Sequence, residues 1–206
     1  MILIKDKALV YSLGNLFVTP YPTENLLAKA FLKFEEDGIM DRIWYAGSVS
    51  IGWFINEYSK NKAILALWVK TRNSGSIDKD LDLAGLAWFN EKYQIGDSKL
   101  CKAEVGIGFL RAFQKRSITL PLAAMACEWA LDNLGVYALF GTTPEPNVAA
   151  IRFFKQLGWG SVGPIPNYTT FPDVADPVGV YISFTSQKDW AVTRGKHFVQ
   201  QKQDNF

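Results

Sequence analysis

Cysteine and histidine are scarce in this chain of 206 residues, which has two cysteines, Cys101 and Cys127, and a single histidine, His197. Neither cysteine stands in a CxxC or Cys/His spacing, so the sequence predicts no metal site. A lone histidine in a polar C-terminal segment gives no support to a Ser-His-Asp or Cys-His catalytic site. So few cysteines fit a reducing compartment, and we expect a cytoplasmic protein.

An excess of charge of one sign is also missing. The 22 basic and 20 acidic residues are mixed along the chain and give a net charge of +2, so no electrostatic footprint for nucleic acid is visible. No run of about 18 uncharged apolar residues occurs, and no charged segment followed by a long apolar one opens the chain. We therefore expect no nucleic-acid partner, no membrane span and no signal peptide.

Apolar residues, in contrast, are plentiful: 49% of the chain is hydrophobic and 14% is aromatic. That is enough to bury one large core. We expect a single domain over residues 1–206, in which 189–206 form a C-terminal segment containing a short helix and a tail. The seven tryptophans are spread over the predicted elements, which favours core and cleft lining over a stacking surface for bases.

Apolar spacing predicts the elements of the first half. A helix is expected over residues 24–36, with Thr23 as its cap and Gly38 at its stop. A second helical segment begins near Asp41 and reaches Ile55, although Gly47 and Gly52 weaken it. Three extended segments, 63–71, 81–91 and 102–110, are separated by turn-rich stretches and predict an antiparallel meander.

In the second half, helices alternate with strands. A helix over 119–134, a strand over 137–142, a helix over 147–157 and a strand over 178–184 are expected. Strands 102–110 and 137–142 flank a helix and should be parallel. The predicted fold is α+β, with helices on both faces of a mixed, mostly antiparallel sheet, and the parallel strands part to leave a ligand crevice.

Residues 147–159 carry the most informative pattern, Asn-Val-Ala-Ala-Ile-Arg-Phe-Phe-Lys-Gln-Leu-Gly-Trp. Asn147 stands at a strand-to-helix turn, where it can cap the helix and still offer an amide to a ligand. A second pattern precedes the helix over 119–134, where free backbone N–H groups and the helix dipole favour a phosphate and Lys115 and Arg116 add charge. Taken alone, this second pattern is better explained by an ordinary capped turn with solvated basic residues.

Together, the two patterns resemble the GNAT acyl-CoA N-acyltransferases over residues 102–159, and the segments around 166–168 and 180–190 look like the branch that acetylates ribosomal-protein N-termini. Gln114 matches the first residue of the family's pyrophosphate motif, Gln/Arg-x-x-Gly-x-Gly/Ala. Ser117 and Thr119 replace its small residues. Glycine would allow left-handed backbone angles there, which cost other residues about 1–2 kcal/mol.

The resemblance implies that acetyl-CoA is the cosubstrate, that no metal is needed and that a primary amine of a protein or small molecule is the acceptor. Acceptor contacts would come from the N-terminal helices and from the segment around Tyr168. The implied cofactor-binding residues are Ile107, Phe109, Leu110, Gln114, Lys115, Arg116, Ser117, Ile118, Thr119, Asn147 and Phe154.

Glu104 is the candidate general base, because it lies on the strand that precedes the pyrophosphate turn, close to where the histone-acetylating branch keeps a glutamate. A partly buried carboxylate could act there through a water molecule. A glutamate on the solvent face of the strand, with no catalytic role, is an equally good interpretation.

The general acid is less clear. Phe154 stands where the family often has a tyrosine, and Thr142 stands where some N-terminal acetyltransferases have a glutamate. Tyr168 is the candidate acid and Tyr137 and Thr143 are its substitutes, although a structural role is the favoured interpretation of each of the three. A thiol has a pKa near 8.5 and needs less help to leave than an alkoxide.

Two functions remain open at this point. One is an N-acetyltransferase that uses acetyl-CoA. The other is a catalytically weak or inactive protein of the same fold that serves in binding or assembly, such as the phage proteins that resemble it, because a fold alone does not determine an activity.

Overall fold

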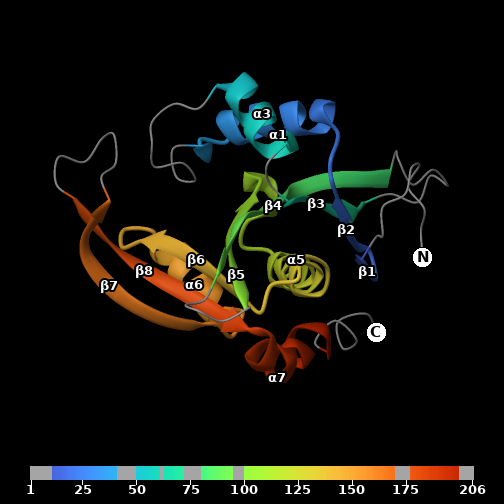
Figure 1. Ribbon diagram of the computed structural model, residues 1–206. Coiled ribbons are helices and arrows are strands. Elements are labelled where there is room, and N and C mark those ends of the chain that lie inside the picture. Colours follow the sequence, from blue (N-terminus) through green and yellow to red (C-terminus); the bar gives the residue numbers. More distant parts are fainter. Residues whose placement is uncertain are drawn as a thin grey trace.

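The computed structural model describes residues 11–40, 50–60, 63–71, 80–94, 100–169 and 177–199. Within them, one eight-stranded sheet has the order β1-β2-β3-β4-β5-β6-β8-β7, and helices cover both of its faces (Figure 1). Neighbouring strands are antiparallel except β5 and β6, which are parallel. The predicted fold class, including the parallel pair, is confirmed.

The strands include every strand that the sequence predicts. They are β1 (Tyr11–Leu13), β2 (Leu16–Pro20), β3 (Ala63–Lys70), β4 (Leu81–Gln94), β5 (Cys101–Phe109), β6 (Ala138–Pro144), β7 (Gly160–Thr169) and β8 (Val178–Ser186). The sequence interpretation missed β1, β2 and β7. The first two form a short hairpin around Gly14, whose φ of 59° is the left-handed value that a tight turn requires.

The helices are α1 (Glu24–Glu36), α3 (Ile51–Lys60), α5 (Thr119–Asn133), α6 (Val148–Gln156) and α7 (Gln187–Val199), with a 3₁₀ turn, η1 (Arg111–Phe113). Thr23 caps α1 as predicted, since its Oγ1 accepts a hydrogen bond from the Leu26 N–H at 3.3 Å. The expected second helix is seen as α3, and its predicted beginning, 41–49, lies outside the described residues. The C-terminal segment is a longer helix than predicted.

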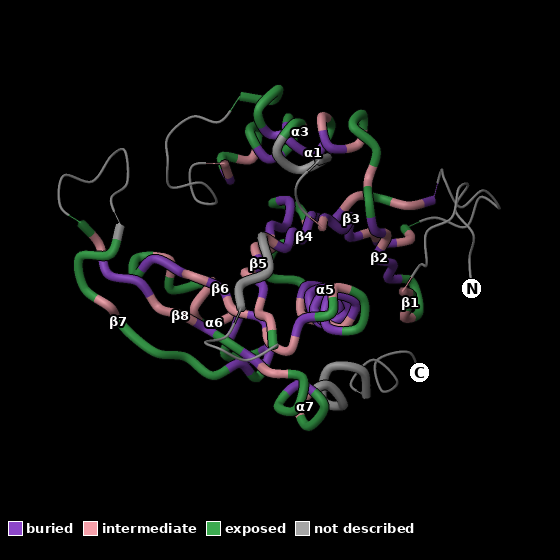
Figure 2. The backbone as a smooth tube through the Cα atoms, in the orientation of Figure 1, coloured by how far each residue is buried: buried purple, intermediate pink, exposed green. Residues whose placement is uncertain are grey.

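The core has two parts, one on each face of the sheet. Apolar residues of α1 and α3 pack against β3 and β4, whereas α5, α6 and α7 pack against the opposite face. The sides of α5 are buried almost all round, and the buried residues concentrate along α5 and strands β2 to β5 (Figure 2). This arrangement leaves β5 in the middle of the sheet with side chains on two different surfaces.

Cys127 lies in the middle of α5 and is completely buried, as its interpretation as a core residue requires. Burial raises the pKa of the Cys127 thiol, because the charged thiolate is disfavoured away from water. We expect at most one thiol, the half-buried Cys101, to react with a thiol reagent in the native protein, and two to react in guanidinium. Two reactive thiols in the native protein, or one remaining in a Cys101→Ser variant, would contradict the burial of Cys127.

β7 was missed because its sequence contains Pro164 and Pro166, which cannot donate a hydrogen bond to a neighbouring strand. β7 pairs with β8 alone and forms one edge of the sheet, where a missing N–H is tolerated. The strand is exposed over most of its length and curves away from the helices with β8 (Figures 1 and 2). The local sequence therefore disfavours a strand over these residues. Their position at the edge of the sheet is what makes the strand possible.

Among the described residues, none of the helices is both long enough and apolar enough to cross a bilayer.

Candidate functional site

The parallel strands β5 and β6 separate after a short stretch of pairing. Their register joins Lys102 with Ala138, Ala103 with Leu139 and Glu104 with Phe140, and within the described residues the pairing ends there. β5 continues to Phe109 along β4, and β6 continues to Pro144 along β8. The two strands therefore part at their carboxyl ends, where the sequence predicts the crevice.

Every second residue of β5 directs its backbone N–H and C=O groups toward this opening. The Tyr137 N–H donates to the Cys101 carbonyl at 2.7 Å, and the Leu110 N–H donates to the Ala84 carbonyl at 2.9 Å. Odd-numbered residues of β5 therefore direct their backbone groups toward β6 and even-numbered residues toward β4. Beyond Glu104, Val105, Ile107 and Phe109 thus direct their backbone groups into the opening, where β6 does not pair with them.

The three predicted cofactor residues at the end of β5 differ in where their backbone groups point. Ile107 offers its backbone to the opening, as expected. The Phe109 carbonyl also points that way, but it accepts a hydrogen bond from Gln114 Nε2 at 2.9 Å. Leu110 has its N–H on Ala84 and a side chain that is 4% exposed and packed with α1 and α3, so its backbone donor does not face the opening.

The turn between β5 and α5 is exposed and positively charged. Lys115, Arg116 and Ser117 are exposed, and the Arg116 guanidinium lies 5.6 Å from the centre of the Phe113 ring. α5 begins without a side-chain cap at Ile118. The Thr119 N–H donates to the Arg116 carbonyl at 3.2 Å and Pro121 has no N–H, so the N–H groups of Ser117, Ile118 and Leu120 are the ones that could face an anion at this helix start.

The backbone angles of this turn correct one expectation. Lys115 has a φ of 59°, in the left-handed region, whereas Ser117 and Thr119, which replace the family's glycines, do not have positive φ. Thr119 instead donates through its Oγ1 to the Arg116 carbonyl at 3.0 Å. The conformational cost of losing glycine therefore falls on Lys115 and not on the two positions that the motif indicated.

A contact that the sequence did not reveal ties this turn to α1. The Arg111 N–H donates to Asp37 Oδ2 at 2.6 Å, and Asp37 is the residue that ends α1. The two residues are 74 positions apart, so no local pattern indicates the contact. It fixes the start of the turn between β5 and α5 against α1, the helix that covers the opposite face of the sheet.

Asn147 caps α6, as predicted: its Oδ1 accepts a hydrogen bond from the Ala150 N–H at 3.2 Å. The side chain is half-buried, and its Nδ2 remains as a donor for a ligand. Asn147 follows β6 at the end of the strand that borders the opening, across from the α5 turn. The predicted dual role, cap and ligand amide, is therefore geometrically available.

Phe154 lies in the core and not on the surface. Its ring is 7% exposed, packs 4.8 Å from the Trp159 ring, and lies over Gly141, where a Cβ would be 2.8 Å from its Cζ. Gly141 is the first β6 residue after the last pair with β5. Phe154 thus forms an apolar floor beneath the point where the strands part, and it brings no proton donor there.

Glu104 lies on the opposite surface of the sheet from Phe154. Ala103, Val105 and Phe109 pack with α5 and α6, so the intervening Glu104 and Gly106 face the side of α1 and α3. Glu104 is half-buried, and the Asn90 Nδ2 donates to its Oε2 at 3.1 Å. The same contact fits the alternative interpretation, a glutamate that pairs with a neighbouring strand and has no catalytic role.

Trp88 covers the neighbouring position on β5. A Cβ on Gly106 would lie 2.1 Å from the Trp88 ring, so only glycine lets the indole pack flat on the strand. Asn90 and Trp88 therefore belong to the surroundings of Glu104, although the sequence interpretation assigned no role to either. Because they are two residues apart on β4, the sequence indicates that both lie on one face of that strand. Only the register of β4 with β5 shows that this face lies beside Glu104.

The structure does not bring Tyr168 close to Glu104. Glu104, Phe140, Phe184 and Gly160 are successive partners across the sheet, and Tyr168 lies eight residues beyond Gly160, about 25 Å along a strand. Its ring is 56% exposed. Of the substitutes, Thr143 is buried and Tyr137 is half-buried at the start of β6.

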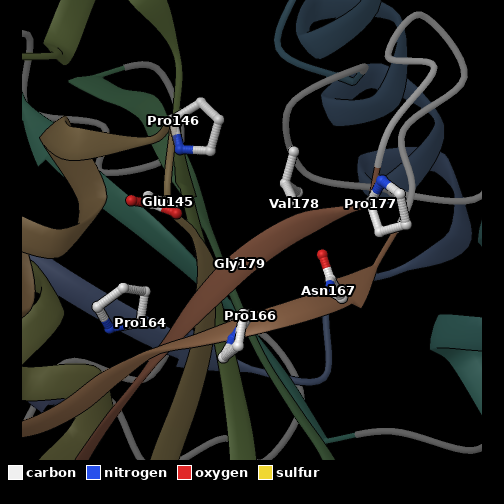
Figure 3. Close-up of a pocket in the computed structure, with 8 residues that line it drawn as sticks. All are labelled: Glu145, Pro146, Pro164, Pro166, Asn167, Pro177, Val178 and Gly179. Atoms are coloured by element: carbon white, nitrogen blue, oxygen red, sulfur yellow. The ribbon is translucent and has the colours of Figure 1, made fainter.

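A separate pocket of about 380 Å³ lies on the β7 side of the turn that leads into α6 (Figure 3). The carboxylate of Glu145 stands on one side and Asn167 on the other, and proline rings lie around them (Figure 3). The pocket contains none of the residues predicted to bind the cofactor. It is lined by Glu145, Pro146, Pro164, Pro166, Asn167, Pro177, Val178 and Gly179. It forms a concave surface beside the segment that the sequence analysis expected to contact an acceptor.

Over the ranges that the structure describes, no group of three or more histidine, cysteine, aspartate or glutamate side chains is arranged to hold a metal ion.

The sheet thus parts between its two parallel strands, with the start of α5 on one side of the opening and the Asn147-capped helix α6 on the other. The sequence profile described as the Acetyltransferase (GNAT) family matches residues 42–159. The chain belongs to this family. A search among curated protein sequences found no match.

Solved structures of the same fold share little sequence with the chain. Spermidine N-acetyltransferase from Vibrio cholerae, in complex with CoA and spermine, has a TM-score of 0.66 at 14% identity and covers 86% of this chain and 98% of its own. RimJ from Mycobacterium smegmatis, in complex with CoA-disulfide, has a TM-score of 0.69 at 9% identity, covering 91% and 89%. RimL, a ribosomal L7/L12 alpha-N-protein acetyltransferase, has a TM-score of 0.64 at 11% identity, covering 86% and 97%.

Proposed function

We propose that this protein transfers an acetyl group from acetyl-CoA to a primary amine of a protein or a small molecule. The observation that carries the proposal is the early separation of β5 from β6, which leaves the backbone groups of Val105 and Ile107 directed into an opening. Such groups can hold an extended amide-containing chain by strand-like hydrogen bonds. The pantetheine arm of acetyl-CoA is a chain of this kind.

The diphosphate of the cosubstrate would lie at the start of α5. Backbone N–H groups of Ser117 and Ile118 and the helix dipole favour negative charge there, and the exposed Lys115 and Arg116 add to the field. Gln114 fixes the turn through its bond to the Phe109 carbonyl, and Thr119 fixes it through its bond to Arg116. The chain thus supplies the turn, the charge and the donors without a glycine at position 117.

The acceptor approaches from the face of α1 and α3, where Glu104 lies. Attack on the thioester requires a neutral amine, and Glu104 is the base that takes up the proton of the attacking nitrogen, directly or through water. The Ile107 N–H faces the opening and can stabilise negative charge on the thioester oxygen. The departing thiolate needs no dedicated acid, which fits the apolar Phe154 and the distance of Tyr168.

Asn147→Asp tests the cosubstrate site with little effect on the fold. Aspartate caps helices as well as asparagine does, so the melting temperature should change little. The variant loses the Nδ2 donor and gains a negative charge, and we expect its affinity for acetyl-CoA to fall about tenfold, the equivalent of roughly 1.4 kcal/mol. Calorimetric titration of the wild type and the variant measures this difference.

The wild type should gain about 2.7 kcal/mol of stability at acetyl-CoA concentrations of 100 times Kd, which a thermal-shift series detects. Asn147→Ala serves as the matched control, because it loses both the cap and the donor and should lower stability by about 1 kcal/mol as well as affinity. An unshifted wild type at millimolar acetyl-CoA would overturn the proposed function.

A second candidate function is supported by Phe154. Because this residue is apolar and packed on Gly141, the chain could bind acyl-CoA and act in binding or assembly without efficient turnover. Release of free thiol from acetyl-CoA with a panel of polyamines and peptides separates the two candidates. Binding without thiol release above the rate of hydrolysis would favour the second.

A further inference from the structure

The Asn90 side chain carries an unpaired polar atom beside the proposed base. Its Nδ2 donates to Glu104 Oε2 at 3.1 Å, whereas its Oδ1 is buried and has no hydrogen-bond partner among the residues that the structure describes. A buried acceptor without a donor is unfavourable, and most buried polar atoms in proteins avoid this state. A donor that forms in another state of the site would satisfy this oxygen.

Glu104 itself can become that donor. An ionised carboxylate only accepts hydrogen bonds, so the amide must turn its Nδ2 toward it. After Glu104 has taken up a proton, its carboxyl group has an O–H donor, and a half-turn of the amide brings Oδ1 into position to accept it. Asparagine can therefore hydrogen-bond Glu104 in both of its protonation states. Leucine offers no hydrogen bond to either state, and an ionised aspartate offers none to the carboxylate.

The surroundings of Glu104 are mostly apolar. β4 contributes Trp88, which covers Gly106, and β6 contributes Phe140, the register partner of Glu104. Lys102 is the charged side chain that shares this face of β5, and its Nζ lies 5.0 Å from the centre of the Phe140 ring. In the part of the chain that the structure describes, the hydrogen-bond donor to the Glu104 side chain is Asn90.

We propose that Asn90 is a positioning residue that holds Glu104 in place throughout the transfer, through Nδ2 while Glu104 is a carboxylate and through Oδ1 once it is protonated. The inference rests on the proposed function. In that step the amine nitrogen bonds to the acetyl carbon, the C–S bond breaks with its electron pair on sulfur, and the proton lost by nitrogen passes to Glu104. The thiolate then takes up a proton from solvent, and Glu104 returns its proton to solvent.

The first test observes the side-chain amide directly in the full chain without cosubstrate. The ¹H–¹⁵N resonances of the Asn90 amide, identified by their loss in Asn90→Asp, should shift through one titration step as pH falls. The step should be absent in Glu104→Gln, because no carboxylate remains to be protonated. Resonances of Asn90 that do not titrate in the wild type would overturn the proposal.

The second test is kinetic. Asn90→Leu should lower kcat by 10- to 100-fold and leave the KM for acetyl-CoA within twofold, because the cosubstrate site is untouched. Asn90→Asp places two carboxyl groups side by side, and such pairs retain a shared proton. The rising limb of kcat against pH should therefore move up by about one unit or more.

Asn133→Ala is the matched control, because Asn133 donates to the Trp129 carbonyl at the end of α5, away from the opening. It should lower the melting temperature and leave kcat and the pH limb unchanged. If the wild type turns over and both Asn90 variants keep its kcat and its pH limb, the role of Asn90 is overturned and the proposed function stands. Absence of turnover in the wild type would overturn the proposed function and this role with it. If Asn90→Leu does not fold, the pH limb of Asn90→Asp and the amide titration still test whether Asn90 holds Glu104.

Discussion

Replacing Glu104 with glutamine is expected to lower kcat by about 10²–10⁴-fold, the range for loss of a positioned general base. Glutamine has nearly the same shape and keeps a carbonyl oxygen that can accept from Asn90 Nδ2, so the fold and the affinity for acetyl-CoA should be preserved. Only the ability to take a proton is removed. Thiol release measured against amine concentration, together with calorimetric titration of acetyl-CoA, separates these effects.

Glu128→Gln is the matched control for the loss of one negative charge. Glu128 lies on α5 near Tyr11 of β1, at the sheet edge opposite to β7. Its kcat should equal that of the wild type. If Glu104→Gln turns over as fast as this control, Glu104 is not the base, and deprotonation of the amine by solvent becomes the better account.

The largest effect on stability is expected at Gly85. A Cβ there would lie 2.2 Å from the carbonyl oxygen of Gly108 and 3.0 Å from Phe109 Cα, and both are backbone atoms that cannot rotate away. Gly85→Ala must therefore push β4 and β5 apart at the border of the opening. We expect a loss of about 3 kcal/mol or more, or a fall in melting temperature of about 6–12 °C.

Gly52→Ala provides the opposite result from the same chemical change. Gly52 lies in α3, and a Cβ there meets no atom within 4 Å, so the variant should be more stable by about 0.5–1 kcal/mol. Denaturant unfolding of both variants measures the contrast. Equal effects at the two positions would mean that the close approach of Gly85 to Gly108 is not a feature of the folded protein.

The elements of this protein were largely predictable from local patterns. The helical spacing of Leu27, Phe31 and Phe34 predicted α1, and these residues are buried as expected. The turn-to-helix pattern at Asn147 predicted both the start of α6 and the cap, because capping is decided by neighbouring residues. β7 was missed for the converse reason, since its prolines are acceptable only at a sheet edge.

The candidate site was predictable only in part. Gln114 to Thr119 and Asn147 were identified because each lies where a strand gives way to a helix, which is visible locally. The partners of Glu104 were not, because Asn90 reaches it through the antiparallel register of β4 and β5. The same holds for Asp37, which fixes the turn between β5 and α5 from 74 residues away.

By itself, the sequence determined the family, most of the helices and strands, and the two strand-to-helix turns that we propose as the acyl-CoA site, since helix caps, strand patterns and charged turns depend on residues close together in the chain. Tertiary structure alone decided that the strands part after Glu104, that Lys115 and not Ser117 takes the left-handed angle, and that Phe154 is a floor of the opening. These features depend on sheet register and on packing between distant segments. Local spacing carries no information about either.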